Sequence, residues 1–139
     1  MPKFSKRSRG RLDTCHPRLI TLFDQVIKSY DCTILEGYRG KQAQDEMLRS
    51  GRSKLNYPKS KHNSSPSLAV DVVPYPINWQ NTERMRHFAG FVFGVASVMG
   101  IRLRWGGDWD GDVMTTDNGL RDQSFMDLPH FELIPEDDS

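Results

Sequence analysis

Leu68-Ala69-Val70-Asp71-Val72-Val73 is an apolar run of strand length with one carboxylate inside it. Its length and its β-branched residues predict a buried strand. Burial of a carboxylate costs several kcal/mol unless the group is paired, protonated or bound to a metal ion. Asp71 therefore needs a compensating partner, which can be a salt bridge, a metal ion or, on an exposed polar face of the strand, water.

Helix and strand patterns alternate on both sides of this run. Apolar residues three and four positions apart predict helices over 17–30 and 81–100, with a weaker helix over 41–49. Short apolar runs predict further strands over 32–36, 101–105 and 130–134, and the polar stretch 52–67 predicts a long loop. This order predicts one α+β domain over 1–139, with a small, mainly antiparallel sheet and flanking helices. Because Asp71 lies inside a predicted strand, a metal ion bound by it would lie at the sheet.

Length and composition limit the class of protein. The chain has 139 residues, of which 37% are hydrophobic and 27% are charged, as is typical of one soluble globular domain. It lacks the run of roughly 18 apolar residues that a membrane span requires. No apolar stretch follows the basic N-terminus, so we expect synthesis in the cytoplasm without a secretory signal. Two cysteines, Cys15 and Cys32, are too few for a disulfide framework and are expected to be thiols that act as small hydrophobic residues.

Charge is distributed unevenly along the chain. Residues 106–139 contain ten acidic side chains and one basic side chain, although the net charge of the whole chain is +1. The preceding part is therefore strongly basic, which favours contact with an anionic polymer. We predict that residues 1–11 form a flexible basic arm that contacts an anionic polymer, such as nucleic acid or the lipopolysaccharide or peptidoglycan of a cell envelope. We also predict that residues 135–139 form a frayed tail.

Two histidines and two aspartates are candidates for a metal site. His62 lies in the long loop, where a lone histidine is more often a surface residue, whereas His130 begins a strand with Asp127 three positions earlier. Two imidazoles and the Asp71 carboxylate form a ligand set typical of catalytic zinc, which keeps one position open for water. A nearby carboxylate such as Asp127 could accept a proton from that water.

These residues resemble a known family, the metallopeptidases of peptidoglycan that include the D-alanyl-D-alanine carboxypeptidases, the dipeptidases and the phage L-alanyl-D-glutamate endopeptidases. The family pattern is Ser-x-His-x-x-Gly-x-Ala-x-Asp, followed much later by an acidic residue, two positions and a histidine. Here the pattern is matched by Ser60-Lys61-His62, Ser67-Leu68-Ala69-Val70-Asp71 and Asp127-Leu128-Pro129-His130. Two further segments are similar, Gly37-Tyr38-Arg39 and Trp105-Gly106-Gly107-Asp108-Trp109, so the resemblance extends from about residue 17 to residue 134.

The resemblance implies a zinc enzyme with roles for six residues: Zn²⁺ ligands at His62, Asp71 and His130, a general base at Asp127, a substrate-binding arginine at Arg39 and a supporting position at Ser60. The sequence departs from the pattern between His62 and Asp71, where there are two extra residues and Ser67 replaces the glycine. An insertion in an irregular loop can bulge outward while both ligands stay in place.

The resemblance also bears on the substrate. The carboxypeptidase and dipeptidase branches typically carry Glu at the base position, whereas the phage endopeptidases carry Asp, as this chain does at Asp127. This implies an L-alanyl-D-glutamate endopeptidase that cleaves peptidoglycan stem peptides, in the manner of a bacteriophage endolysin. Such an antimicrobial hydrolase is expected to be a monomer that accumulates in the host cytoplasm and reaches the wall during host cell lysis, once the membrane is opened.

An acidic loop after the predicted strand 101–105 is a candidate site for a second cation. Asp108, Asp110 and Asp112 alternate there as calcium ligands do, but the glycine and the glutamate of an EF-hand are absent. Some phage endopeptidases of the family have a regulatory calcium site near this position, so the resemblance implies Ca²⁺ as a second cofactor. A solvated acidic loop is the alternative.

Two other functions are consistent with parts of the sequence. A D,D-carboxypeptidase would have the same zinc site and fold but would release free D-alanine from the stem peptide. A basic nucleic-acid-binding protein would use the arm over 1–11, bind DNA in a salt-dependent way and need no metal. That second alternative leaves Asp71, Asp127 and His130 unexplained.

Overall fold

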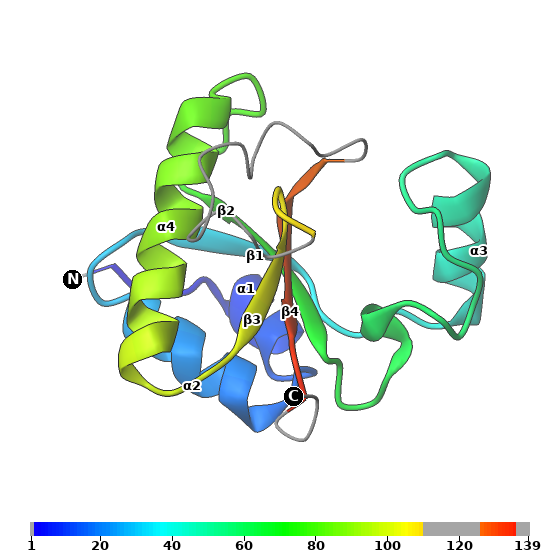
Figure 1. The fold of residues 1–139 in the computed structure, drawn as a ribbon, viewed down its shortest axis with the longest axis horizontal. Helices are drawn as coiled ribbons and strands as arrows, with labels where there is room; N and C mark the ends of the chain where they lie inside the picture. The colour runs from blue at the N-terminus through cyan, green and yellow to red at the C-terminus, as the bar shows by residue number, and fades with distance from the viewer. Residues whose placement is uncertain (1, 110–125, 136–139) are drawn as a thin grey trace.

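Four antiparallel strands form a central sheet in the order β1-β2-β4-β3. The structure is a computed structural model that describes residues 2–109 and 126–135. Its strands are β1 (Cys32–Glu36), β2 (Ala69–Pro74), β3 (Leu103–Gly106) and β4 (Asp127–Leu133). β2, which contains Asp71, lies inside the sheet between β1 and β4 (Figure 1). The predicted class, α+β with a small antiparallel sheet and flanking helices, is confirmed.

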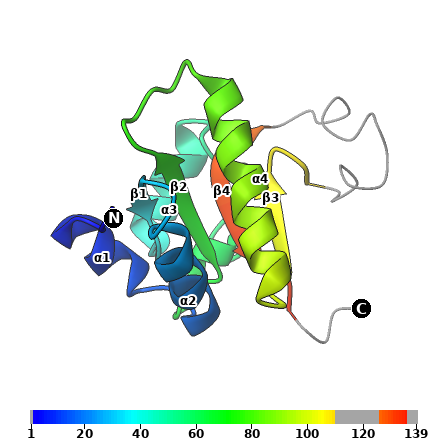
Figure 2. The same ribbon diagram turned by 90° about the vertical axis from the view of Figure 1, so that its left-hand side faces the viewer.

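One face of the sheet is covered by two helices, α2 (Pro17–Val26) and α4 (Thr82–Val98), which lie in front of it in Figure 2. Both helices place an apolar face against the strands. Phe131 of β4 meets the rings of Phe23 and Phe88 edge-on, with ring centroids 5.9 and 6.2 Å apart. This apolar layer is the core of the domain.

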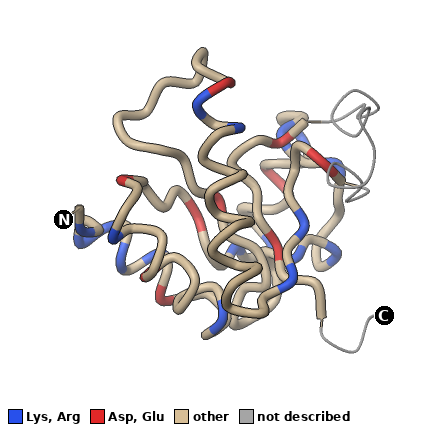
Figure 3. Tube along the Cα trace, turned by 60° about the vertical axis from the view of Figure 1, so that its left-hand side comes forward, with Lys and Arg blue, Asp and Glu red and all other residues tan. Residues whose placement is uncertain are grey.

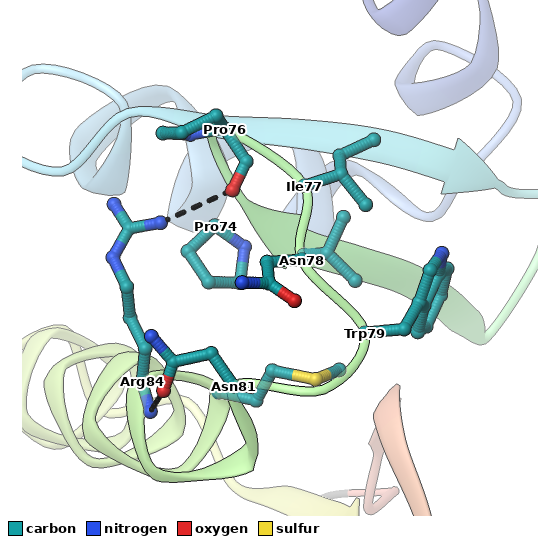
Figure 4. A pocket seen from close by; sticks show the side chains of 9 residues that line it. Pro74, Pro76, Ile77, Asn78, Trp79, Asn81 and Arg84 are labelled. Atoms are coloured by element: carbon teal, nitrogen blue, oxygen red, sulfur yellow. Dashed lines mark hydrogen bonds between the residues drawn. The ribbon is translucent and has the colours of Figure 1, made fainter.

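The loop between β2 and α4 is held by the first turn of α4. Asn81 is the N-cap of the helix, and its side chain accepts a hydrogen bond of 3.2 Å from the backbone N–H of Arg84. The Arg84 guanidinium donates to the carbonyl oxygens of Tyr75 and Pro76 at 2.7 and 3.3 Å. Figure 4 shows this loop around a small pocket, with the indole of Trp79 at one side. These bonds set the path by which the chain leaves the sheet and returns along the core.

On the opposite side of the sheet, the short 3-10 helix η1 (Lys61–Asn63) contacts β2, and α3 (Lys41–Arg49) lies farther out, behind the sheet in Figure 2. Successive side chains of a strand point to opposite faces. Val70 and Val72 therefore enter the core, while Asp71 between them faces η1. The strand sequence thus produces one apolar face and one polar face.

Residues 6–11 do not belong to a flexible arm, so the prediction of an arm over 1–11 is wrong for them. They form a helix, α1 (Lys6–Leu12), which packs against the edge strand β1. Leu12 is fully buried, the Ser8 hydroxyl accepts a hydrogen bond of 3.1 Å from the Ile34 N–H, and Arg11 donates to the Ile34 carbonyl at 3.1 Å. No apolar period marks this helix in the sequence, because Leu12 is its only large apolar residue.

Three further predictions concern burial, the tail and the membrane. Cys15 and Cys32 are buried free thiols, and burial raises the pKa of each to about 12. Of the predicted tail, Pro135 is half-buried after β4, and residues 136–139 lie outside the described residues. Among the helices that the structure describes, none is long and apolar enough to cross a membrane.

Candidate metal centre

His62, Asp71 and His130 meet on the polar face of the sheet. They come from η1, β2 and β4. Asp71 Oδ1 lies 3.1 Å from His62 Nε2 and 3.3 Å from His130 Nδ1. One ligand atom from each of the three residues lies within 4.8 Å of the other two. Two nitrogens and one oxygen therefore converge at a point that could hold a metal ion.

The register of the sheet places two of these three residues. Asp71 of β2 is directly opposite His130 of β4. Opposed residues in antiparallel strands have side chains on the same face, with Cβ atoms about 4.5–5.5 Å apart. Glu132, two positions after His130, points to that same face, whereas Phe131 between them enters the core. The alternation that builds the core thus also presents the polar groups.

The third residue, His62, is held by the N-cap of η1. The Ser60 hydroxyl accepts a hydrogen bond of 3.2 Å from the His62 backbone N–H, and the Ser60 N–H donates to Asn63 Oδ1 at 3.1 Å. Reciprocal bonds of this kind fix the start of a short helix. Ser60 therefore touches the backbone of His62, which is the contact that a supporting residue would make.

The departure from the family pattern does not separate His62 from Asp71. Ser67, which stands where the pattern has glycine, is fully buried. Its N–H donates to the Thr14 carbonyl at 2.9 Å, and its carbonyl accepts from the His16 N–H at 2.8 Å. These bonds anchor the longer loop beside the segment before α2, and the two side chains still meet.

Both imidazoles are oriented by a partner on the side away from Asp71. His62 Nδ1 lies 2.7 Å from the Gly37 carbonyl oxygen, and His130 Nε2 lies 2.8 Å from Glu132 Oε1. Carbonyl and carboxylate oxygens accept hydrogen bonds, so these two nitrogens carry the protons. The other nitrogen of each ring faces the shared point, as in metal-ligating histidines. The donor set and its orientation therefore fit a divalent cation.

The charges at the centre also favour a cation. Burial raises the pKa of Asp71, but the charges and hydrogen bonds of His62 and His130 outweigh burial and hold the pKa well below its usual range. Burial lowers the pKa of His130, but hydrogen bonds to Asp71 and Glu132 raise it to about 9. Positive charge is thus stabilised between these carboxylates, and a metal ion would take the place of the proton.

Asp127, the predicted base, lies beside the three candidate ligands at the start of β4. Its Oδ2 is 3.9 Å from His130 Nδ1, and its side chain is 31% exposed. Burial and the charge of Asp71 raise the pKa of Asp127 to about 6. A Cβ at Gly106 of β3 would overlap the Asp127 carbonyl oxygen, so this glycine allows the two strands to approach closely.

Arg39 also reaches the centre, as a buried residue. Its Nη2 lies 3.7 Å from Asp71 Oδ2. Its Nε donates to Glu36 Oε1 at 2.8 Å, its Nη2 pairs with the same oxygen, and its Nη1 donates to Gln44 Oε1 at 2.8 Å. The guanidinium is therefore held in place by the protein itself, and its contact with substrate stays a prediction.

Three polar residues at the site were not singled out from the sequence. Glu36 and Glu132 pair with Arg39 and His130, and each lies within three positions of its partner in the sequence, which is a usable signal. Gln44 of α3 is fully buried, and its Nε2 donates to Ser53 and to the Leu55 carbonyl. No pattern marked it, because a glutamine on an amphipathic helix is normally exposed.

The predicted calcium ligands are described only in part. Asp108 is buried in the turn after β3, whereas Asp110 and Asp112 lie outside the described residues. The calcium site therefore stays a prediction. The ring centroid of Trp109 lies 5.3 Å from that of His130, so the segment after β3 returns to the metal centre.

Known proteins share both the sequence and the fold of this chain. Residues 1–134 match the model of a family described as phage L-alanyl-D-glutamate peptidase. The L-alanyl-D-glutamate peptidase of Escherichia phage T5 is 32% identical over 138 residues, which cover 95% of this chain and 98% of that protein. The crystal structure of the Serratia marcescens L-Ala D-Glu endopeptidase ChiX matches with a TM-score of 0.73 at 28% identity, over 95% of this chain and 90% of that chain. The chain therefore belongs to the phage L-alanyl-D-glutamate peptidase family.

Proposed function

We propose that this chain is a zinc-dependent endopeptidase that hydrolyses the L-alanyl-D-glutamate bond of peptidoglycan stem peptides. The observation that carries the proposal is the convergence of His62, Asp71 and His130. In both imidazoles, the nitrogen that faces away from Asp71 is already hydrogen-bonded. Membership of the phage L-alanyl-D-glutamate peptidase family supports the choice of substrate.

The donor atoms favour zinc over the harder cations. Two imidazole nitrogens and one carboxylate are a usual protein ligand set of catalytic zinc, whereas Mg²⁺ and Ca²⁺ prefer oxygen ligands only. When bound, zinc would polarise the scissile carbonyl and lower the pKa of a water molecule. Glu132 and the Gly37 carbonyl would keep both histidines in the tautomer that binds metal.

Asp127 is the proposed general base. Its carboxylate would accept a proton from the attacking water and pass it to the amine nitrogen of D-glutamate as the peptide bond breaks. Its position supports this role, because Oδ2 is close to His130 and the side chain is partly exposed to solvent. A neighbouring carboxylate that is not itself one of the three ligands is free to move protons.

Arg39 is proposed to stabilise the negative charge that develops on the scissile carbonyl oxygen. Glu36 and Gln44 hold its guanidinium before substrate arrives. Charges that are oriented in advance stabilise a transition state without the cost of reorganisation. The role of Arg39 would thus depend on the residues that hold it as much as on its own charge.

In the cell we propose that the chain acts as a phage endolysin. It would act as a monomer on the stem peptides of the host wall, after the membrane has been opened. The family supports this setting, since its described activity is that of a phage peptidase. A single α+β domain with one metal centre would be sufficient for the reaction.

One preparation of purified protein tests the proposal. Metal analysis should find about one zinc per chain, as for a catalytic site with three protein ligands. Digestion of peptidoglycan followed by mass spectrometry should find new C-terminal L-alanine and new N-terminal D-glutamate. Release of free D-alanine would instead indicate a D,D-carboxypeptidase, and salt-dependent DNA binding without hydrolysis would indicate a nucleic-acid-binding protein. Full activity after complete chelation would show that hydrolysis does not depend on zinc.

A further inference from the structure

An open groove of about 440 Å³ lies between α1 and the turn that follows β1. It is lined by residues of both segments: Lys6, Arg7, Gly10, Arg11, Thr14, Leu35, Glu36, Gly37 and Tyr38. Three of these residues are cations, and the basic residues of α1 form the blue segments next to the N-terminus in Figure 3. The carboxylate of Glu36 is already paired with Arg39. The groove therefore has a net positive charge.

The cations of the groove are held on a fixed helix. Ser8 and Arg11 bond α1 to the backbone of Ile34 in β1. Lys6 and Arg7 are exposed, and neither forms a salt bridge with any residue that the structure describes. Two neighbouring cations without a counter-ion, placed on a rigid element, favour an anionic ligand.

The groove adjoins the metal centre. Glu36 is the partner of Asp71 in the β1–β2 register, and the Gly37 carbonyl holds His62. Arg39 pairs with Glu36 and lies 3.7 Å from Asp71. Neighbouring strands are about 4.8 Å apart. A peptide that is bound at the centre and runs toward the β1 edge of the sheet would therefore extend into the groove.

The chemistry of the substrate identifies the anion. D-glutamate has two carboxyl groups, and when its nitrogen is acylated by L-alanine and one carboxyl carries the rest of the stem, the other carboxyl stays free. Wherever this second carboxyl is not amidated, a negative charge lies beside the scissile bond, on the D-glutamate side. We propose, on the basis of the proposed function, that the groove binds this side of the substrate, with Lys6 and Arg7 pairing with the free carboxylate.

Gly10 supports the assignment of the groove as a binding site. It is exposed in the middle of α1, and a Cβ added there would meet nothing within 4 Å. Glycine weakens a helix relative to alanine, and no close contact in the described structure requires it here. The missing side chain leaves open the space between the cations and the turn after β1.

Two peptides test the charge of the groove. Both contain the L-alanyl-D-glutamate bond, and they differ only in whether the free carboxyl of D-glutamate is a carboxylate or a carboxamide. The wild type should prefer the carboxylate peptide by about 2- to 30-fold in kcat/KM, the range expected for one or two exposed ion pairs. Lys6→Gln/Arg7→Gln should reduce this ratio to near unity. The control Lys28→Gln/Arg86→Gln, which removes two exposed cations elsewhere, should keep the wild-type ratio.

Each other outcome has a defined meaning. An unchanged ratio in Lys6→Gln/Arg7→Gln overturns the proposal, and so does an equal loss in the control, which would assign the effect to overall charge. A defect on whole peptidoglycan without one on the peptides would assign the cations to another anionic polymer of the wall and would also overturn it. If the wild type cleaves neither peptide, the proposed function fails. Binding of the labelled carboxylate peptide then tests the groove separately. Equal affinity of the wild type and Lys6→Gln/Arg7→Gln for this peptide would reject the groove as its binding site.

A steric experiment tests the groove without a change in charge. Gly10→Phe should fill it and raise KM several-fold for the carboxylate peptide, with kcat nearly unchanged. Gly90→Phe is the matched control, since Gly90 is also exposed in a helix and a Cβ there would also meet nothing within 4 Å. Circular dichroism should show that both variants are folded. An unchanged KM in folded Gly10→Phe would reject the groove as part of the substrate site.

Discussion

The two faces of the central sheet are held together by different kinds of interaction. On the face covered by α2 and α4, many apolar side chains share the packing, and Phe131 is one member of a large cluster. On the other face, His62, Asp71 and His130 meet through individual hydrogen bonds, each with a specific partner. The difference shows that alternate residues of one strand can serve stability and chemistry separately, so adjacent substitutions should have different consequences.

Substitutions at two consecutive residues of β4 should show the largest difference between the two faces of the sheet. His130→Ala removes a candidate ligand, so we expect loss of most of the metal and at least about a 1,000-fold loss of activity, because metal catalysis supplies several kcal/mol. Phe131→Ala should instead lower the free energy of unfolding by about 3–5 kcal/mol through the cavity it leaves. Metal analysis, peptide cleavage and urea unfolding measure these effects. A His130→Ala protein with full metal content would reject the assignment of this ligand.

Removal of the metal sharpens the same comparison. A ligand that binds only the folded state raises stability by mass action. Chelation should therefore abolish wild-type activity and lower Tm. The same treatment should leave the Tm of His130→Ala unchanged. Phe131→Ala has an intact polar face, so chelation should still lower its Tm. An identical Tm of the wild type with and without chelator would show that this face holds no stabilising cation.

Asp127→Asn tests proton transfer on the polar face. Asparagine is nearly isosteric but cannot accept the proton, and general base catalysis is worth about 100- to 10,000-fold in rate. Turnover should fall by at least the lower factor, with fold and zinc content retained. Zinc and cleavage should be measured on the same preparation. An active Asp127→Asn variant would rule out Asp127 as the general base. An inactive variant without zinc would make Asp127 a metal ligand instead.

Arg39→Lys tests the geometry of the guanidinium. Lysine keeps the charge but lacks the planar fork that binds Glu36 and Gln44 together. We expect about a 10- to 100-fold loss of activity, less than the full loss of an oxyanion donor, with normal metal content. Arg49→Lys, on the exposed surface of α3, is the control. Wild-type rates in Arg39→Lys would make Arg39 a structural residue only.

Gln44→Met should give the smallest effect, and it tests whether the polar face depends on single residues. Methionine fills a similar volume but removes the acceptor of the Arg39 Nη1–H. It also removes one of the two acceptors of Asn63 Nδ2. The free energy of unfolding should fall by about 1–3 kcal/mol, and kcat should fall with zinc retained. Gln42→Met, at an exposed position of the same helix, should change neither quantity. Equal kcat in both variants would show that Gln44 does not position Arg39.

Most of the secondary structure was predictable because its signals are local. The helix predicted over 41–49 and the strand predicted over 32–36 match α3 and β1, and α4 lies within the helix predicted over 81–100. Apolar period and breakers such as glycine are properties of neighbouring residues. α1 was not predictable in this way, since contacts with Ile34, far along the chain, hold it in place.

By itself, the sequence determined the alternation of Val70, Asp71 and Val72, the fold class and, through the motifs at His62, Asp71 and His130, the family that the chain resembles. Only the tertiary structure decided how these three residues meet, which groups orient them, and that a buried Gln44 and a basic groove lie beside them. The physical reason is the distance along the chain over which each kind of interaction acts. Periodicity records which face of one element is apolar, whereas a hydrogen bond between distant segments depends on strand register and helix placement, which no local pattern contains.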